Sequence, residues 1–315
     1  MNRFIVASHG WSASNYVAHV LNLHPQIACA HSSAAILAED KAMFDGDNLR
    51  QLIPELRKGY LARQQLGLED RYSTLETQVA ELGSHLSNNA QTKWLGTVHT
   101  YRMRDLPVQL EKFEFSCGRK YQLVNLVRHP LDLVVSGFGQ FLDLFKVDIN
   151  EYAWSLNKII AVRNGIDFVE KAVEDTEYKP GDYEVICFAS ACAVLGSLRL
   201  DVDATEKLTV YEGAPFDYLG PVLMEDIISS PEAVARLAYL LTSGQAEISD
   251  SYLEDVAGVK KVNRHNHASP DGTLARWGML PPWQKKLFAN FFSHFELRTP
   301  YENMGYNFDF LAEIE

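Results

Sequence analysis

The sequence predicts an α/β fold: a three-layer sandwich whose central sheet is mainly parallel. Two observations support this fold class. Short β-rich apolar runs alternate along the chain with longer segments whose apolar residues recur at helical spacing. One run, "KYQLVNLVRHP" at residues 120–130, is apolar on both faces, which is typical of a strand inside a parallel sheet. No internal repeat or low-complexity linker separates these segments, so we expect a single domain over residues 1–315.

The amino-terminal segments predict a strand, a tight loop and a helix. Residues 3–8 form a short β-rich run, and Val17, Val20 and Leu21 then recur at helical spacing. The pair His24-Pro25 ends that helix. Residues 34–90 carry two amphipathic helical patterns separated by a polar stretch, so we expect a helical insert there.

The middle of the chain predicts further strands and core helices. Strands are expected at residues 92–101 and 120–130, and Pro130 is acceptable in the first turn of the helix that follows. Residues 149–173 and 183–200 have the pattern of core helices, although part of the second run also fits a strand. A fourth strand is expected at residues 218–228.

The last third of the chain predicts helices around one polar loop. Ser230 can cap the next helix, with Pro231 in its first turn. A short helix is expected at residues 248–258, whereas the stretch at 260–277 is polar, cationic and rich in turn residues, which favours a loop. The sequence after this loop predicts a helix followed by an aromatic tail. Three phenylalanines of this segment are expected in the core: Phe291, Phe292 and Phe295.

Composition and charge argue against nucleic acid as a partner. The formal net charge is −12 and the pI is near 5.3, which disfavours a general polyanion-binding surface. A local basic pocket for one small anion remains compatible with this charge. The four cysteines show no CxxC spacing, so we expect reduced thiols, and neither a disulfide framework nor a metal site.

The sequence also predicts a cytoplasmic, soluble protein. Its first residues lack the charged flank, apolar core and cleavage site of a signal peptide. No run reaches the roughly 18 apolar residues that a membrane span needs, so no stable membrane insertion is expected. The sequence carries no indication of oligomeric state.

The loop "SHGWSASN", residues 8–15, has the character of an anion site. A parallel strand that runs through a loop into a helix presents unpaired backbone N–H groups at the positive end of the helix dipole. Gly10 permits the turn, and Ser12, Ser14 and Asn15 add side-chain donors. The alternative is a plain turn whose serines cap the helix. The nucleotide-triphosphatase signature G-x-x-x-x-G-K-[ST] is absent, because both its second glycine and its lysine are missing.

Two other strand ends carry candidate ligand-binding residues. The strand at 120–130 brings Arg128 to its carboxyl end, and Ser136 lies about two turns along the following helix, so both could contact one phosphate. The alternative pairs Arg128 with Asp132. His99 ends another strand, at the edge where open α/β sheets bind ligands, although a lone histidine is often structural.

The order of these motifs resembles the sulfotransferase family that uses 3′-phosphoadenosine-5′-phosphosulfate (PAPS). "SHGWSASNYVAHVLNLHP" is similar to that family's phosphosulfate loop, P-[KR]-S-G-T-T-[WL], and helix. "RHPLDLVVS" matches the Arg, Pro, Asp and Ser spacing of its 3′-phosphate motif, R-[ND]-P-x-D-x-x-x-S. "TVHTYRMRDLP" resembles its K-T-H-L-P strand end, "VLMEDIISSPEAVARLAYLL" its "YEDL…P" element, and "DGTLARWGMLPP" the late loop that closes over the cofactor. The likeness covers most of the chain and implies a P-loop-like sulfotransferase fold.

The resemblance implies a transfer of a sulfuryl group from PAPS to a hydroxyl, and secondarily an amine, of a small-molecule, lipid or sugar acceptor. The spent cofactor is 3′-phosphoadenosine 5′-phosphate (PAP), and no metal is required. His99 becomes the leading base, with His9 a second catalytic candidate. The segment at 249–280 is expected to close over the cofactor. The resemblance implies these cofactor-binding residues: Gly10, Trp11, Ser12, Ala13, Ser14, Asn15, Arg128, Ser136, Arg264, Arg276 and Trp277.

The chain departs from the family pattern in the phosphosulfate loop. Trp11 stands where the family has a lysine or arginine, and Ala13 stands where it has a glycine. The missing cation could be replaced by one of four other residues: His9, Arg102, Arg264 or Arg276. Trp11 fits either an aromatic wall for a ligand or a hydrophobic plug.

Two other functions remain open at this point. A catalytically degenerate protein could bind PAP or PAPS without turnover, since the loop has lost its cation. A kinase with a modified phosphate loop is disfavoured by the absence of the lysine and of an evident pair of magnesium-binding carboxylates.

Overall fold

The computed structural model describes residues 2–31, 92–99, 101–106, 120–144, 183–210, 215–259 and 272–314. The expected insert at 34–90, the expected helix at 149–173 and most of the polar loop, at 260–271, lie outside these ranges. The chain divides into two compact units. We call Met1–Val127 with Ala204–Val262 the sheet unit, and Arg128–Asp203 with Asn263–Glu315 the helical unit.

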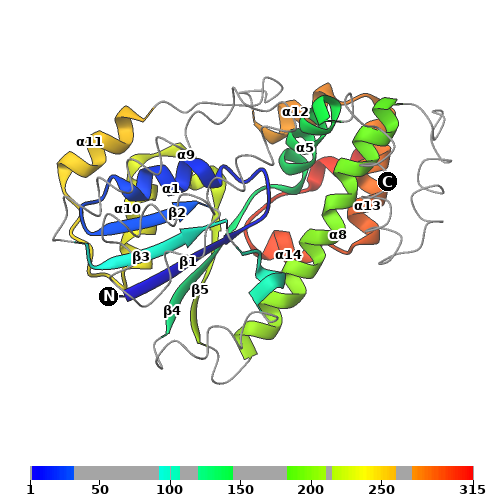
Figure 1. The fold of residues 1–315 in the computed structure, drawn as a ribbon. Helices are drawn as coiled ribbons and strands as arrows, with labels where there is room; N and C mark the ends of the chain where they lie inside the picture. Colours follow the sequence, from blue (N-terminus) through cyan, green and yellow to red (C-terminus); the bar gives the residue numbers. More distant parts are fainter. Residues whose placement is uncertain are drawn as a thin grey trace. The chain divides into compact units, whose positions relative to one another are not determined.

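The sheet unit is built on a five-stranded, all-parallel sheet with the order β2-β3-β1-β4-β5, which gives the chain its α/β class (Figure 1). A parallel sheet and the strands near 3–8, 92–101, 120–130 and 218–228 were predicted, whereas β2 was not. The strands are β1 (Asn2–Ser8), β2 (Ile27–His31), β3 (Trp94–Val98), β4 (Tyr121–Val127) and β5 (Phe216–Leu223).

Helices cover both faces of this sheet. Side chains alternate along β1, so Phe4 and Val6 enter one apolar core while Ile5 and Ala7 enter the other. The last turns of α8 (Tyr183–Val210) and the short helix η4 (Met103–Asp105) pack in the second core. The helices of the first core are α1 (Ser14–Asn22), α9 (Met224–Ser229), α10 (Pro231–Leu241) and α11 (Asp250–Gly258).

Local capping chemistry sets several boundaries in the sheet unit. Ser230 Oγ accepts a hydrogen bond from the Ala233 N–H at 3.2 Å and Pro231 begins α10, as predicted. Ser249 caps α11 in the same way. The fourth strand is shorter than predicted: β5 ends at Leu223, and the next residues turn into α9 instead of continuing to residue 228.

The helical unit has an aromatic core. Helix α8 is helical throughout, which excludes the partial strand, and α12 begins within the stretch predicted to be a loop. Phe291, Phe292 and Phe295 are buried in the core, as predicted. The other elements are α5 (Pro130–Leu144), α12 (Thr273–Met279), α13 (Pro282–His294), α14 (Arg298–Asn303) and η5 (Asp309–Glu313).

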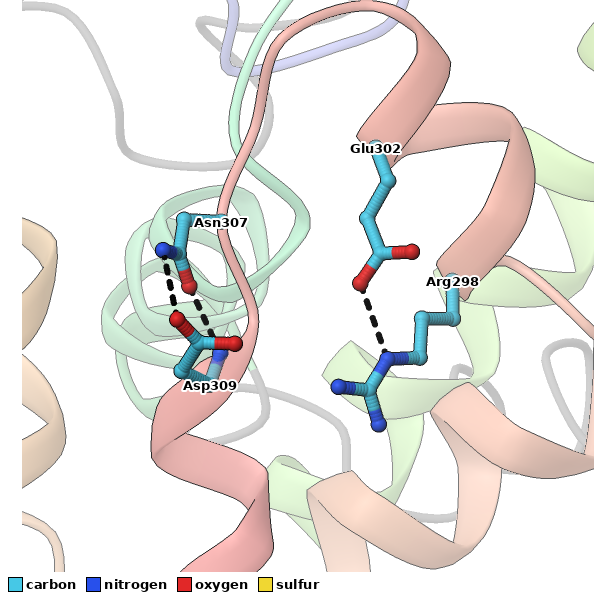
Figure 2. Close-up of polar contacts among 4 residues, drawn as sticks. All are labelled: Arg298, Glu302, Asn307 and Asp309. Atoms are coloured by element: carbon cyan, nitrogen blue, oxygen red, sulfur yellow. Dashed lines mark hydrogen bonds and ion pairs between the residues drawn. The ribbon is translucent and has the colours of Figure 1, made fainter.

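A closed turn joins α14 to η5 (Figure 2). Asn307 Oδ1 accepts from the Asp309 N–H at 2.7 Å, and Asn307 Nδ2 donates to Asp309 Oδ2 at 2.9 Å. An ion pair between Arg298 and Glu302 spans one turn of α14. The turn fixes the backbone on both sides of Phe308, which is fully buried.

Three of the four cysteines are free thiols in the buried interior, as predicted: Cys29, Cys187 and Cys192. Cys117 lies outside the described residues.

Among the helices that the structure describes, none is long and apolar enough to cross a membrane.

Candidate functional site

Three adjacent strands bring polar side chains to one edge of the sheet. The strands β2, β3 and β1 are parallel neighbours, so their carboxyl ends meet. His31 ends β2, His99 follows β3 directly, and Ser8 ends β1. β1 also lies where the strand order reverses, since β3 pairs on one side of it and β4 on the other. Ligands of open α/β sheets bind at the carboxyl ends of strands beside such a reversal.

The geometry around His99 suits a general base. Its Nδ1 lies 2.8 Å from Ser8 Oγ and 3.2 Å from the Ser8 carbonyl oxygen. Because a carbonyl only accepts hydrogen bonds, this arrangement favours the proton on Nδ1 and leaves the lone pair on Nε2. His99 also has a φ of 62°, a strained conformation for a non-glycine residue that is typical of functional sites.

His31 is a member of this cluster that sequence reasoning missed. Its Nε2 lies 2.9 Å from Ser14 Oγ on the first turn of α1. Its ring stacks on that of His99, with centroids 5.4 Å apart and an interplanar angle of 19°. Two serine–histidine pairs therefore lie side by side at the sheet edge. The signal available in the sequence was a five-residue run, "IACAH", that follows a helix stop and ends in a histidine.

The loop between β1 and α1 has left-handed residues at alternate positions, a pattern that also occurs in anion-binding nests. Trp11 has a φ of 65° and Ala13 a φ of 50°, while Gly10 and Ser12 are not in the left-handed region. Such alternation turns successive N–H groups toward one side of the loop. The turn was expected to depend on Gly10, and the strain falls instead on two residues with side chains.

Ser12 and His9 each bury a polar atom in this loop. The Ser12 Oγ and His9 Nε2 atoms have no hydrogen-bond partner within the described part of the chain, and the two residues are only 1% and 9% exposed. His9 Nδ1 lies 3.3 Å from the Gly10 carbonyl oxygen, so this ring also stabilises the turn. A buried, unpaired hydroxyl is costly in a folded protein and points to a missing partner such as a ligand oxygen.

His9 is uncharged at neutral pH. Burial lowers its pKa well below the usual value, and the positive charges of Arg102 and Arg104 lower this pKa further. His9 therefore does not replace the missing loop cation as an imidazolium. The same effects show that two arginine charges act on the loop from the segment that follows β3.

Two other side chains of the loop segment, those of Trp11 and Asn15, are partly exposed. Trp11 is partly exposed and lies outside both apolar cores of the sheet unit. This position favours an aromatic wall for a ligand over a hydrophobic plug that anchors the turn. Its ring is tilted against that of His9, with centroids 6.2 Å apart. Asn15 is partly exposed on the first turn of α1.

The predicted 3′-phosphate residues belong to the helical unit. Arg128 follows β4 directly and is partly exposed, and Ser136 is buried on the second turn of α5. The expected alternative partner of Arg128, Asp132, is engaged elsewhere: its Oδ2 accepts from Thr273 Oγ1 at 2.9 Å, and its Oδ1 pairs with Arg276 Nη1 at 2.7 Å. Arg276 therefore ties α12 to α5.

Trp277 occupies the aromatic core of the helical unit, which corrects its predicted place in a cofactor-closing loop. It is 3% exposed, and its ring packs against those of Phe288 and Phe310. Its Nε1 donates to Glu313 Oε2 at 3.3 Å. These contacts favour a structural role. Arg264 lies outside the described residues.

His129, between Arg128 and α5, was not singled out by the sequence. Its Nδ1 accepts a hydrogen bond from the Leu131 N–H at 3.2 Å, so it caps α5 as the Asn or Asp of the resembled motif would. Its ring packs against those of Tyr306, Phe308 and Phe310. Burial lowers the pKa of His129 to about 4, in spite of the opposing charge of Asp132.

No group of three or more His, Cys, Asp or Glu side chains suited to a metal occurs in the residues that the structure describes. Comparisons of the chain with protein-family models, with curated proteins and with solved structures found no match. The described arrangement is a loop with a buried serine hydroxyl at the amino end of α1, beside a histidine whose hydrogen bonds favour the proton on Nδ1.

Proposed function

We propose that the chain is a PAPS-dependent sulfotransferase, with a P-loop-like sulfotransferase fold, that acts on a hydroxyl of a small-molecule, lipid or sugar acceptor. One observation carries the proposal: the buried hydroxyl of Ser12 has no partner among the described residues and lies in a nest-like loop at the amino end of α1. His99, directly after the neighbouring strand β3, supports the same proposal because its favoured tautomer suits proton removal.

Each compact unit carries residues that suit one anionic end of PAPS. The N–H groups of the β1–α1 loop and the Ser12 hydroxyl would hold the 5′-phosphosulfate. Arg128 and Ser136, whose spacing matches the 3′-phosphate motif, would hold the 3′-phosphate. When bound, PAPS supplies the sulfuryl group and remains as PAP.

His99 would act as the general base. Its Nε2 would accept the proton of the acceptor hydroxyl as the oxygen gains its bond to sulfur. Ser8 holds Nδ1 and keeps the ring in the tautomer that can take this proton. Loop N–H groups and Ser12 would stabilise the negative charge left on the departing phosphate oxygen.

Calorimetry with PAP tests cofactor binding. The wild-type chain should bind PAP, and Arg128→Ala should weaken binding at least tenfold because a charge-assisted contact to phosphate is lost. Arg298→Ala, which removes a surface ion pair of the same unit, is the matched control and should leave the affinity unchanged. No PAP binding by the wild-type protein would refute the proposal.

Transfer of labelled sulfate from PAPS to a panel of hydroxyl acceptors tests the chemistry. His99→Asn is the variant of choice because asparagine tolerates the left-handed backbone found at this position. It should retain PAP affinity and lose about 10²–10⁴-fold in turnover, the usual contribution of a general base. Full turnover in this variant would remove His99 from that role.

A catalytically degenerate PAP-binding protein is the second candidate. The observation that favours it is Trp11, which occupies the position of the loop cation in the resembled motif. Tight PAP binding without turnover across the whole acceptor panel would select this function. Stabilisation by ATP and magnesium, but not by PAPS, would instead indicate a kinase.

A further inference from the structure

The proposed function leaves open which residue supplies positive charge to the β1–α1 loop. Of the four residues that could replace the loop cation, His9 is uncharged because its pKa is lowered by burial and by neighbouring arginines. Arg276 pairs with Asp132 in the helical unit. Arg264 lies outside the described residues. Among the described residues this leaves Arg102, which belongs to the sheet unit, as the loop does.

The backbone of Arg102 is fixed next to the site. The Ser8 N–H donates to the carbonyl oxygen of Tyr101 at 3.1 Å, which ties the segment after β3 to the end of β1. The Arg102 N–H donates to Asp105 Oδ2 at 2.9 Å, and the Asp105 N–H donates to the Arg102 carbonyl oxygen at 2.9 Å. The arginine thus starts from a rigid turn instead of a free loop.

The charge of Arg102 already acts on the loop. After burial, it has the largest effect in lowering the pKa of His9, and Arg104 comes next. Within the described residues the Arg102 guanidinium has no ion pair, since the nearby Asp105 uses its Oδ2 to hold the Arg102 backbone. Arg102 is also partly exposed, so its side chain has access to a ligand.

We propose that Arg102 replaces the missing loop cation and contacts the 5′-side anionic group held by Ser12 and the loop N–H groups. A guanidinium can bind two oxygens of a phosphate or sulfate at once. As the acceptor oxygen bonds to sulfur, the bond from sulfur to the phosphate oxygen breaks and its electron pair stays on that oxygen. Arg102 stabilises this charge, while the acceptor proton passes to His99. Because the cation comes from the segment after β3, position 11 of the loop is free to be a tryptophan.

This inference rests on the proposed function. Two adenosine ligands test the contact of Arg102 with the 5′-side group separately from binding of the 3′-phosphate. PAP carries both phosphates, whereas adenosine 3′-phosphate lacks the one that the loop would hold. Arg102→Gln should weaken PAP at least tenfold and leave adenosine 3′-phosphate unchanged. Arg102→Lys should retain part of the affinity for PAP. Arg104→Gln is the comparison variant on the same segment, and it should weaken PAP binding less than Arg102→Gln does because the charge of Arg104 has the smaller effect on His9.

Equal PAP affinity in Arg102→Gln and the wild type would overturn the role of Arg102, as would an equal loss in Arg104→Gln. Circular dichroism and melting temperature verify that each variant is folded, and Arg102→Lys serves as the readout if Arg102→Gln is not.

A second measurement separates failure of this inference from failure of the proposed function. If the wild type does not bind PAP, inorganic sulfate is titrated while the ring protons of His9 are followed by NMR. A sulfate-dependent shift in the wild type that is lost in Arg102→Gln supports the cation role without PAPS chemistry. No shift in the wild type, or the same shift in Arg102→Gln, overturns it.

Discussion

Two serines of the β1–α1 loop differ in the surroundings of their hydroxyl groups. Ser14 Oγ lies 2.9 Å from His31 Nε2, whereas Ser12 Oγ is buried without a partner in the described residues. A buried hydroxyl that lacks a hydrogen bond destabilises the fold, and one that has a hydrogen bond contributes about 1 kcal/mol. Substitution of Ser12 should therefore affect mainly ligand affinity, and substitution of Ser14 mainly the free energy of unfolding.

Ser12→Ala should leave the free energy of unfolding unchanged or raise it by up to about 1 kcal/mol, because an unpaired buried group is removed. The same variant should bind PAP more weakly. Ser14→Ala should instead lower the free energy of unfolding by about 1 kcal/mol, since the hydrogen bond between Ser14 and His31 is lost. Urea denaturation and calorimetry measure the two quantities. Destabilisation by Ser12→Ala that equals that of Ser14→Ala would show that the Ser12 hydroxyl has a partner in solution.

At the scale of one element, α5 begins on a histidine cap. His129 Nδ1 accepts a hydrogen bond from the Leu131 N–H, and the His129 ring packs against three aromatic residues. Arg128 lies between the end of β4 and this cap, so the cap fixes the backbone directly after Arg128.

His129→Asn keeps a side-chain acceptor at the cap, whereas His129→Ala removes it. Both variants lose the aromatic contacts. We expect Asn to be more stable than Ala by about 1 kcal/mol, the usual value of a helix cap, in urea denaturation. If the two variants unfold alike, the hydrogen bond to Leu131 adds nothing to the stability of α5.

Elements whose signal is local could be predicted from the sequence. β1, α1, β4 and α5 each combine apolar periodicity with a clear start or stop, and the structure confirms them. β2 was missed because its short run of alanine and cysteine has little β signal of its own. α12 was taken for a loop because its first residues follow directly on a polar, turn-rich stretch. A tertiary contact, the pair between Arg276 and Asp132, holds α12 to α5.

At the scale of the whole molecule, the candidate site depends on which strands become neighbours. The loop and His99 were accessible to motif reasoning because each follows its own strand. The stacking of His31 on His99 was not, since it depends on β2 pairing with β3 and β3 with β1. The same strand order ties Tyr101, and with it Arg102, to the end of β1.

The buried histidines should make the protein sensitive to mild acid. Burial lowers the pKa of His129 from 6.5 to about 4, and the pKa of His9 shifts in the same direction. Between pH 6.5 and 4 the unfolded chain binds protons that the folded chain does not. The free energy of unfolding should therefore fall as pH is lowered through this range, by about 3 kcal/mol for His129. Above pH 6.5 these groups add no further dependence.

Urea denaturation at a series of pH values measures this effect. His129→Asn has no titrating ring, so its stability should change less between pH 6.5 and 4 than that of the wild type. A variant curve with the same slope as the wild-type curve would assign the acid sensitivity to other groups.

The left-handed backbone at Trp11, Ala13 and His99 has a practical consequence for protein engineering. At each of these positions glycine would adopt the observed φ without steric cost. A directed-evolution selection for heat tolerance alone would therefore favour glycine in the β1–α1 loop and after β3, and it would remove three side chains from the candidate site. Stabilised versions of this protein that are meant to preserve the candidate site should hold these three positions fixed and seek their gains elsewhere in the chain.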